Sequence, residues 1–217
     1  MRPIYSLTWI AALVALSLVG CGGGAGSSIT PPNPPPPAAP SSVSPTSVTF
    51  GNTLVGTTAS IWSVTYENDS SGSLAITTVS ASGDYAQSNN CGSSLAAGAA
   101  CTINVTFTPT ASGARSGGLQ VAGDSPQKVP LSGTGVTMHN LQLSWDASSS
   151  SSVMGYFVYS GSVSGGPYTL HNVSPTPSIS FPASVPGGQT WYFIVTAVDA
   201  NQVESVPSNE IAETLPP

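Results

Sequence analysis

Two histidines and one Gly-Asp-Ser run supply the groups that could support acid–base or nucleophilic catalysis in this chain of 217 residues. His139 and His171 are the only imidazoles, and each lies beside an asparagine in loop-like sequence. The run Gly123-Asp124-Ser125 places a serine next to a carboxylate, but Pro126 follows, and all four residue types favour turns. We therefore expect a hairpin turn at 123–126, solvated loop histidines and no catalytic site. The sequence predicts a protein that is not an enzyme.

A second candidate for chemistry is the oxygen-rich segment that contains Asp199, Asn201 and Glu204. Alternating oxygen ligands are one way to hold calcium, but this segment lacks the glycine and the number of ligands of a calcium loop. A hairpin loop between two strands explains the same residues. We therefore expect no metal site and no cofactor.

The composition excludes several classes of partner. The chain carries 3 Lys and Arg against 9 Asp and Glu, so 6% of its residues are charged, where about 25% is usual. So few cations cannot neutralise a phosphate backbone, which excludes nucleic acid as a partner. The 37 Ser, 21 Thr and 23 Gly, with scattered Val and Ile, favour short strands and turns. The composition predicts an all-β fold.

Residues 1–20 have the pattern of a secretory signal peptide. Arg2 precedes an apolar run over 10–19, which is shorter than the roughly 20 residues of a membrane-spanning helix. The run ends in Leu18-Val-Gly-Cys21, which resembles the bacterial lipobox, whose cysteine is lipidated and becomes the first residue of the mature protein. The resemblance implies that a lipid on Cys21 binds the protein to the membrane. Gly22, in place of Asp, implies sorting to the outer membrane of the bacterial envelope, in a periplasmic or surface-exposed position.

Residues 21–40 read as a linker. Gly22 to Pro40 contain four Gly and seven Pro, with almost no side chain that could pack into a core. Such a segment cannot compensate for its ordering entropy by burial, so we expect it to be disordered. Its proline-rich part favours an extended polyproline conformation, which would hold the folded part away from the bilayer.

Residues 41–136 show short apolar stretches separated by turn-forming residues. Ile103, Val105 and Phe107 alternate strictly with polar residues, as on a half-buried strand. About seven such strands in this length predict an Ig-like β-sandwich.

The same segment carries a family resemblance. Val48-Thr-Phe-Gly51, the run 89–109 and Leu131-Ser-Gly-Thr-Gly135 resemble the bacterial choice-of-anchor D repeat, a relative of the hydin and abnormal-spindle domains. The resemblance implies an Ig-like domain but no activity.

Cys91 and Cys101 are the two cysteines that remain if Cys21 is lipidated. The signal peptide directs them to an oxidising compartment, and only one pairing is then possible. We expect a disulfide that closes a loop of 11 residues and stabilises the fold by about 3 kcal/mol. A zinc site or a reactive thiol is the alternative, but no third cysteine remains and the histidines lie far along the chain.

Residues 137–217 resemble a fibronectin type III domain. The resemblance rests on Leu143-x-Trp145, Tyr156-x-Val158 and Pro186-Gly-Gly before the strand that starts at Trp191. The family usually has tyrosine at the position of Trp191, where its hydroxyl bonds the preceding corner. An indole can donate one hydrogen bond but accept none. Either the corner is rebuilt around Trp191, or Tyr192 takes the role in a shifted register.

An aromatic face is the one candidate binding surface. If Tyr156, Val158, Trp191, Phe193 and Val195 face the core, alternation turns four large side chains outward, namely Phe157, Tyr159, Tyr192 and Ile194. An exposed apolar face often marks an interface. It could contact the first domain, bind a partner protein or stack on sugar rings.

The sequence thus predicts two tandem Ig-like β-sandwich domains, 41–136 and 137–217, after a lipoprotein signal peptide and a Gly/Pro-rich linker. The favoured function is a membrane-tethered, non-catalytic module for binding, adhesion or envelope structure. The alternative is a carbohydrate-binding accessory protein for polysaccharide degradation.

Overall fold

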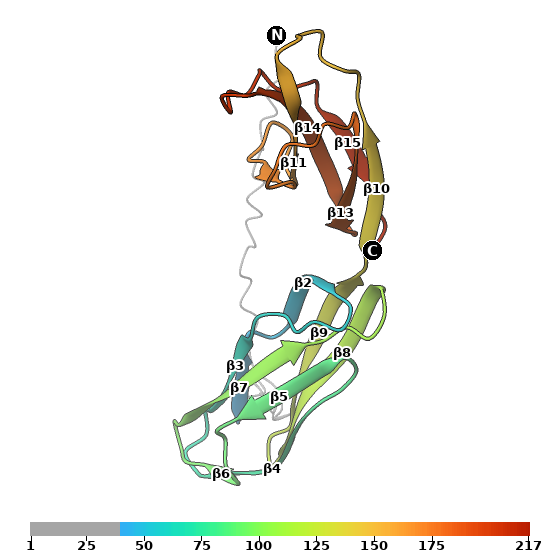
Figure 1. The fold of residues 1–217 in the computed structure, drawn as a ribbon. Coiled ribbons are helices and arrows are strands. Elements are labelled where there is room, and N and C mark those ends of the chain that lie inside the picture. Colours follow the sequence, from blue (N-terminus) through green and yellow to red (C-terminus); the bar gives the residue numbers. More distant parts are fainter. Residues whose placement is uncertain (1–39) are drawn as a thin grey trace, which may run out of the picture. The chain divides into compact units, whose positions relative to one another are not determined.

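A computed structural model describes residues 40–217, which contain fifteen strands and no helix (Figure 1). Over this range no helix is present that could cross a membrane. The expected signal peptide 1–20, Cys21 and nearly all of the expected linker 21–40 lie outside the described residues. The prediction of an all-β fold is confirmed.

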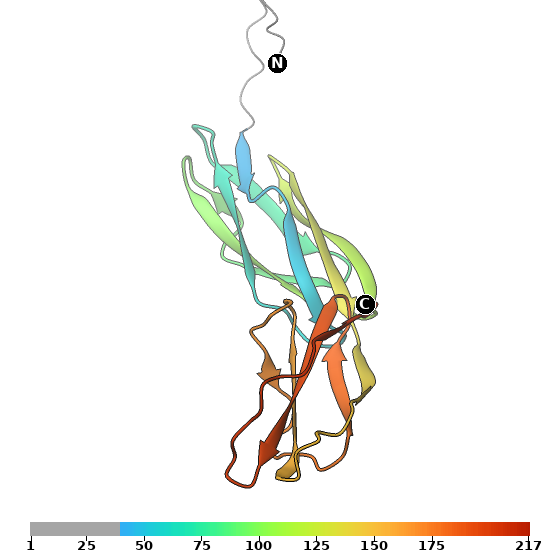
Figure 2. The same cartoon turned by 90° about the horizontal axis from the view of Figure 1, so that it is seen from above.

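Nine strands form the first sandwich, which consists of two sheets (Figures 1 and 2). One sheet has the order β1 (Ser41–Ser44), β3 (Trp62–Asn68), β7 (Ala100–Phe107), β5 (Tyr85–Asn89). The other has the order β2 (Val48–Leu54), β9 (Gln127–Val136), β8 (Gly113–Gly123), β4 (Leu74–Ala81), β6 (Ser94–Leu95). Only β2 and β9 pair in parallel, and all other pairs are antiparallel.

The core of the first sandwich follows the predicted alternation. Ile103, Val105 and Phe107 on β7 are fully buried, because their side chains point between the two sheets. Phe107 stacks on Tyr85 with ring centroids 4.9 Å apart and lies 5.5 Å from the ring of Phe50. These three rings fill the space between the sheets, and adding a Cβ to Gly133 would bring it 2.7 Å from the Phe107 ring. The core is therefore tightly packed at this point.

Six strands form the second sandwich. A two-stranded sheet pairs β10 (Met138–Ser144) with β13 (Ser180–Pro186). A four-stranded sheet has the order β12 (Thr169–Leu170), β11 (Val153–Gly161), β14 (Thr190–Asp199), β15 (Ile211–Thr214). Val158 and Phe193 are buried between the sheets with Leu143, and Trp191 and Val195 pack against this core, as expected from alternation.

The last strand differs from the expectation. The apolar and polar residues of 208–212 suit a strand, but β15 begins only at Ile211. Pro207 has no N–H, so it interrupts a regular ladder with β14. The hydroxyls of Ser205 and Ser208 accept hydrogen bonds from the N–H groups of Ala197 and Val195 at 3.0 and 3.1 Å in place of backbone carbonyls.

The corner between β13 and β14 is rebuilt around tryptophan. Trp191 Nε1 donates a hydrogen bond to the carbonyl oxygen of Pro186 at 2.7 Å. Tyr192 lies on the opposite face of β14 and takes no part. Of the two alternatives that the sequence left open, the structure has the first.

Candidate functional site

The four residues predicted to form an aromatic face do share one face of the β11–β14 sheet. Tyr159 lies opposite Ile194, Phe157 opposite Thr196, and Gly161 opposite Tyr192. Residues that are directly opposite in an antiparallel pair point to the same side. We call this surface, with residues 157, 159, 192, 194 and 196, the outer face.

The outer face is less exposed than predicted. Phe157 and Ile194 are each only 9% exposed, so the expectation that they point freely into solvent is wrong. Tyr159 and Tyr192 are half-buried. The face is therefore two partly exposed tyrosines over two buried apolar side chains, and not an open apolar patch.

Glu204 accounts for part of this covering. The segment 200–210 runs along the edge of β14, with Ser205 N–H donating to Ala197 O at 2.8 Å. This places the Glu204 carboxylate over the outer face, where both of its oxygens lie 2.9 Å from the Tyr159 hydroxyl. Thr196 Oγ1 donates to the same carboxylate at 2.6 Å. Burial, and then the hydrogen bond to Glu204, raises the pKa of Tyr159, so its hydroxyl stays a donor at neutral pH.

A second carboxylate, Glu210, is bonded to the loop that follows β11. Glu210 accepts hydrogen bonds from the Ser164 hydroxyl at 2.7 Å, the Gly165 N–H at 2.9 Å and the Tyr168 hydroxyl. These hydrogen bonds lower the pKa of Glu210 and keep it ionised. The bond from Tyr168 has the largest effect. The loop 162–168 lies close to β11 at Gly161. A side chain there would not fit, since a Cβ on Gly161 would lie 2.6 Å from Pro167 O.

The charge around this face has a single sign. Residues 137–217 contain five carboxylate side chains and neither Lys nor Arg. Sequence reasoning identified the aromatic residues but missed the contact of Glu204 with Tyr159 and that of Glu210 with Tyr168. Glu204 and Glu210 are separated from Tyr159 by more than 40 residues, and no local pattern links them.

The candidate nucleophile lies in a turn, as expected. Asp124 Oδ2 accepts a hydrogen bond from Ala75 N–H at 2.8 Å, and the buried Ser125 hydroxyl lies 2.7 Å from Ser41 Oγ. The Tyr66 hydroxyl donates to Ser125 O at 2.9 Å. These groups join β8 and β9 to their neighbours, and the Ser125 hydroxyl is buried rather than presented at the surface.

Neither histidine is a solvated loop residue, so that expectation is wrong. His139 lies on β10 with a buried Nε2, and His171 packs beside the rings of Phe181 and Phe193 at 6.4 and 6.3 Å. His171 Nε2 lies 2.7 Å from Ser160 Oγ, but Ser160 is only 4% exposed, so no substrate reaches its hydroxyl. Burial lowers the pKa of His171, which keeps the ring neutral at neutral pH.

The oxygen-rich segment is a hairpin loop. Asp199 Oδ1 accepts hydrogen bonds from the N–H groups of Asn201 and Val203 at 2.8 and 3.0 Å. These hydrogen bonds lower the pKa of Asp199, and the bond from the Val203 backbone has the largest effect. Within 40–217 no three His, Cys, Asp or Glu side chains cluster in a way that could hold a metal ion.

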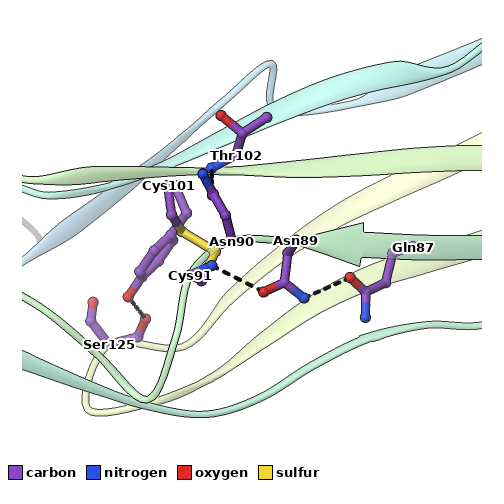
Figure 3. The surroundings of a disulfide bond; sticks show 8 residues. Gln87, Asn89, Asn90, Cys91, Cys101, Thr102 and Ser125 are labelled. Carbon is purple, nitrogen blue, oxygen red and sulfur yellow. Dashed lines mark hydrogen bonds between the residues drawn. A yellow bond between two sulfur atoms is a disulfide. The ribbon is translucent and has the colours of Figure 1, made fainter.

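The expected disulfide between Cys91 and Cys101 is present, with Cα atoms 4.9 Å apart (Figure 3). Asparagine side chains order the backbone around it. Asn89 Oδ1 accepts from Cys91 N–H at 3.1 Å, and Asn90 Oδ1 accepts from Thr102 N–H at 2.7 Å. The disulfide lies in the core of the first sandwich, since both sulfur-bearing residues are buried.

An exposed tryptophan marks a second surface, which sequence reasoning missed. Trp62 on β3 is 48% exposed, and Ile61 beside it is exposed as well. Trp62 borders a cleft of about 510 Å³ that Thr57, Thr58 and Ser60 also line. Trp62 alternates with Val64 and Tyr66 on the same strand, and because these two are buried, the pattern gave no sign that Trp62 is exposed.

Comparison with known proteins finds one family model that matches the first sandwich. Residues 38–129 match the family model of the ASH domain (abnormal spindle-like microcephaly-associated, ASPM-SPD-2-Hydin). No curated protein matches the chain.

Similar solved structures share little sequence with the chain. The ASH/PapD-like domain 7 of human CEP192 is 17% identical, with 54% of this chain and 99% of that chain covered and a TM-score of 0.37. The Vibrio cholerae protease VesB is 17% identical over 44% of this chain and 32% of its own, with a TM-score of 0.36. The secreted serine protease VesC of Vibrio cholerae is 13% identical over 76% of this chain and 49% of its own, with a TM-score of 0.34. The chain thus spans about half of the length of VesC and about a third of that of VesB. The family model of the ASH domain thus matches 38–129, which lie almost entirely in the first sandwich.

Proposed function

We propose that the protein is a lipid-anchored protein of the bacterial envelope, whose two sandwiches act as non-catalytic binding or structural modules. The first sandwich would be an ASH domain of the choice-of-anchor D type, and the second a fibronectin type III domain. The lipobox-like Leu18–Cys21 and the Gly/Pro-rich residues that follow support the anchor and the linker. The ASH match is consistent with a binding or structural role.

The observation that carries this proposal is the pairing of aromatic and acidic groups on the outer face. Tyr159 and Tyr192 are half-exposed, Glu204 is bonded to the Tyr159 hydroxyl, and Glu210 is bonded to the loop 164–168 that follows β11. Partly exposed aromatic side chains with an acidic rim suit a protein surface that presents Lys or Arg. The serine and histidine groups that could do chemistry are bound in structural contacts, which supports a non-catalytic role.

The anchor is tested by fractionation of bacterial cells. The wild-type protein should partition with the outer membrane, and the Cys21→Ala variant should lose this association. A radiolabelled fatty acid should be incorporated into the wild type alone. Equal membrane association of the two proteins would contradict the anchor.

The binding role is tested by photo-crosslinking in cells. A photo-reactive phenylalanine analogue at Tyr192 should give adducts with a discrete partner protein. The same analogue at Val173, which is exposed in a loop of the same sandwich, is the matched control and should give none. Adducts that are equal at both positions, or absent at both, count against the outer face.

Glycan binding is a second candidate function, favoured by the exposed Trp62. A flat indole beside hydroxyl-bearing side chains, with no charged residue in the lining, suits a neutral sugar. On a glycan array, the wild type should bind and Trp62→Ala should not, whereas Tyr192→Ser should bind normally. Binding that survives Trp62→Ala would contradict this site.

A further inference from the structure

The sheet formed by β10 and β13 has an open edge. The two strands pair over seven residues with no register shift, and among residues 40–217 no strand pairs with the other side of β10 (Figure 1). The reason lies in the sequence, because β9 ends at Val136 and β10 begins at Met138. The single residue Thr137 leaves no preceding chain that could fold back as a third strand beside β10.

The hydrogen bonds of β10 identify the backbone groups at this edge. Trp145 N–H donates to Ile179 O at 3.1 Å, and Gly187 N–H donates to Thr137 O at 2.9 Å. In an antiparallel pair, alternate residues direct both backbone groups to the partner. The odd-numbered residues of β10 therefore bond β13. Asn140, Gln142 and Ser144 direct their N–H and C=O groups to the open edge.

A groove lies beside this edge. Its volume is about 540 Å³, and it is bounded by Leu143, Ser144 and Trp145 on one side and by the segment 205–209 on the other. Phe193 and Val195, which belong to the core side of β14, also line it. The groove thus occupies the position that a strand next to β10 would cover.

Two groups along the groove suit an incoming peptide. Trp145 Nε1 is buried and has no hydrogen-bond partner in the described part of the chain, so it is available to a carbonyl oxygen. Val206, on the segment opposite, is 86% exposed and would be covered by a strand in the groove. An unpaired buried donor costs free energy, which an occupant would recover.

The edge of β10 also lacks the features that usually protect edge strands, such as lysine, proline or a bulge. The edge strand β2 of the first sandwich, which is equally long, has a register shift between Thr49 and Asn52. The continuous edge of β10 is therefore suited to β-strand addition.

The negative charge around the groove favours a peptide that carries Lys or Arg. The groove includes Asp146, and the whole of 137–217 holds five carboxylates with no Lys or Arg. A second copy of this chain offers only Arg115 and Lys128 as cations in its described part, so two copies would repel at this edge. The chain's own residues 22–40 contain no cation and seven prolines, which lack the N–H groups that a ladder needs.

We propose that the open edge of β10 and the adjoining groove bind an extended peptide segment of a partner protein that carries Lys or Arg. The segment adds a third strand to the β10–β13 sheet by backbone hydrogen bonds to residues 140, 142 and 144. Its alternate side chains fill the groove over Leu143 and Phe193. Ile194, which lines the groove, also belongs to the outer face, but Tyr192 does not line the groove, so the proposal does not depend on the crosslinking at Tyr192.

The test uses the full-length mature protein and three synthetic octapeptides. One alternates Val and Lys, the second alternates Val and Glu, and the third is the Val/Lys peptide with alternate amides N-methylated. We expect the Val/Lys peptide to bind and to shift the amide NMR signals of Asn140, Gln142 and Ser144. The Val/Glu peptide should not bind. The N-methylated peptide, which cannot form the ladder, should bind at least about tenfold more weakly, which is about 1.4 kcal/mol.

Two variants at one position provide the matched comparison. Gln142→Pro removes an N–H that points to the open edge and leaves the bonds to β13, whereas Gln142→Ala keeps that N–H. The proline variant should weaken Val/Lys binding about tenfold or more, and the alanine variant should stay within about twofold of the wild type. Circular dichroism checks that both variants fold, and the N-methylated peptide decides the question if the proline variant does not.

Three outcomes overturn the proposal. The first is no binding of the Val/Lys peptide, and the second is equal binding of its N-methylated form. The third is a dimer of the wild type in sedimentation that Gln142→Pro disrupts, because a second copy would then be the occupant of this edge.

Discussion

The two regions of the molecule are both β-sandwiches, but they differ in the interactions that stabilise them. The core of the first contains sixteen buried residues, and that of the second contains six. The first also holds the disulfide and the ion pair between Arg115 and Asp84, whereas residues 137–217 contain no Cys, Lys or Arg. Because stability grows with buried apolar area, the first sandwich is expected to unfold last.

The second sandwich compensates with hydrogen bonds from side chains. Hydroxyls of Ser205 and Ser208 replace backbone acceptors along β14, and Trp191 replaces the expected tyrosine at the corner. What it does not cover is the edge of β10. The comparison suggests that the first sandwich is the rigid support and that the second presents the surfaces available for recognition.

The largest expected effect is the loss of an aromatic core residue. Phe107→Ala removes a fully buried ring that contacts Phe50 and Tyr85, and should lower the free energy of unfolding by about 5 kcal/mol. Phe193→Ala in the second sandwich leaves a cavity that opens toward the groove, where water can enter. It should lower the free energy of unfolding by about 3 kcal/mol. Guanidinium unfolding combined with amide exchange on β7 and β14 measures both. Equal costs would contradict the difference in packing between the two cores.

The disulfide should affect the first sandwich alone. Replacing Cys91 and Cys101 by alanine removes a constraint on the unfolded chain and should cost about 3 kcal/mol. Amide exchange on β7 should accelerate, and exchange on β14 should not change. Reduction of the wild type with dithiothreitol is the control, and it should reproduce the effect of the double variant.

Alternation predicted much of this organisation. It placed Ile103, Val105 and Phe107 in one core and Val158 and Phe193 in the other, because each strand buries one face against a facing sheet. It failed for Phe157 and Ile194, which are buried on the opposite face of the same sheet, where Glu204 bonds the neighbouring Tyr159 and Thr196. Contacts between residues so far apart in sequence leave no periodic signal.

The groove beside β10 was also beyond sequence reasoning. Leu143 and Trp145 read as ordinary core residues, and their pattern does not reveal that no strand covers β10 on one side. That fact depends on the single residue Thr137 between β9 and β10, and no local pattern in the sequence shows which strands pair with β10.

A smaller effect is expected at the corner of the second sandwich. Trp191→Phe removes the hydrogen bond to Pro186 O and should lower the free energy of unfolding by about 1 kcal/mol. Trp191→Tyr offers a hydroxyl in the same region and should lose less. Thermal unfolding of the three proteins measures the difference. If the Phe and Tyr variants are equally destabilised, the hydrogen bond contributes nothing and shape alone fixes the corner.

The smallest effect concerns the response of the first sandwich to acid. Hydrogen bonds from Arg115 and Thr110 lower the pKa of Asp84 to about 2 from its ordinary value of 3.8, and the bond from Arg115 has the largest effect. The folded state therefore favours the ionised carboxylate, and this contribution is fully present above pH 3.8 and is lost as the pH falls toward 2. Asp84→Asn should remove this dependence, so the difference in unfolding temperature between wild type and variant should shrink as the pH falls through that window. A difference that stays constant from pH 5 to about pH 2 would show that the Asp84–Arg115 pair does not link protonation to folding.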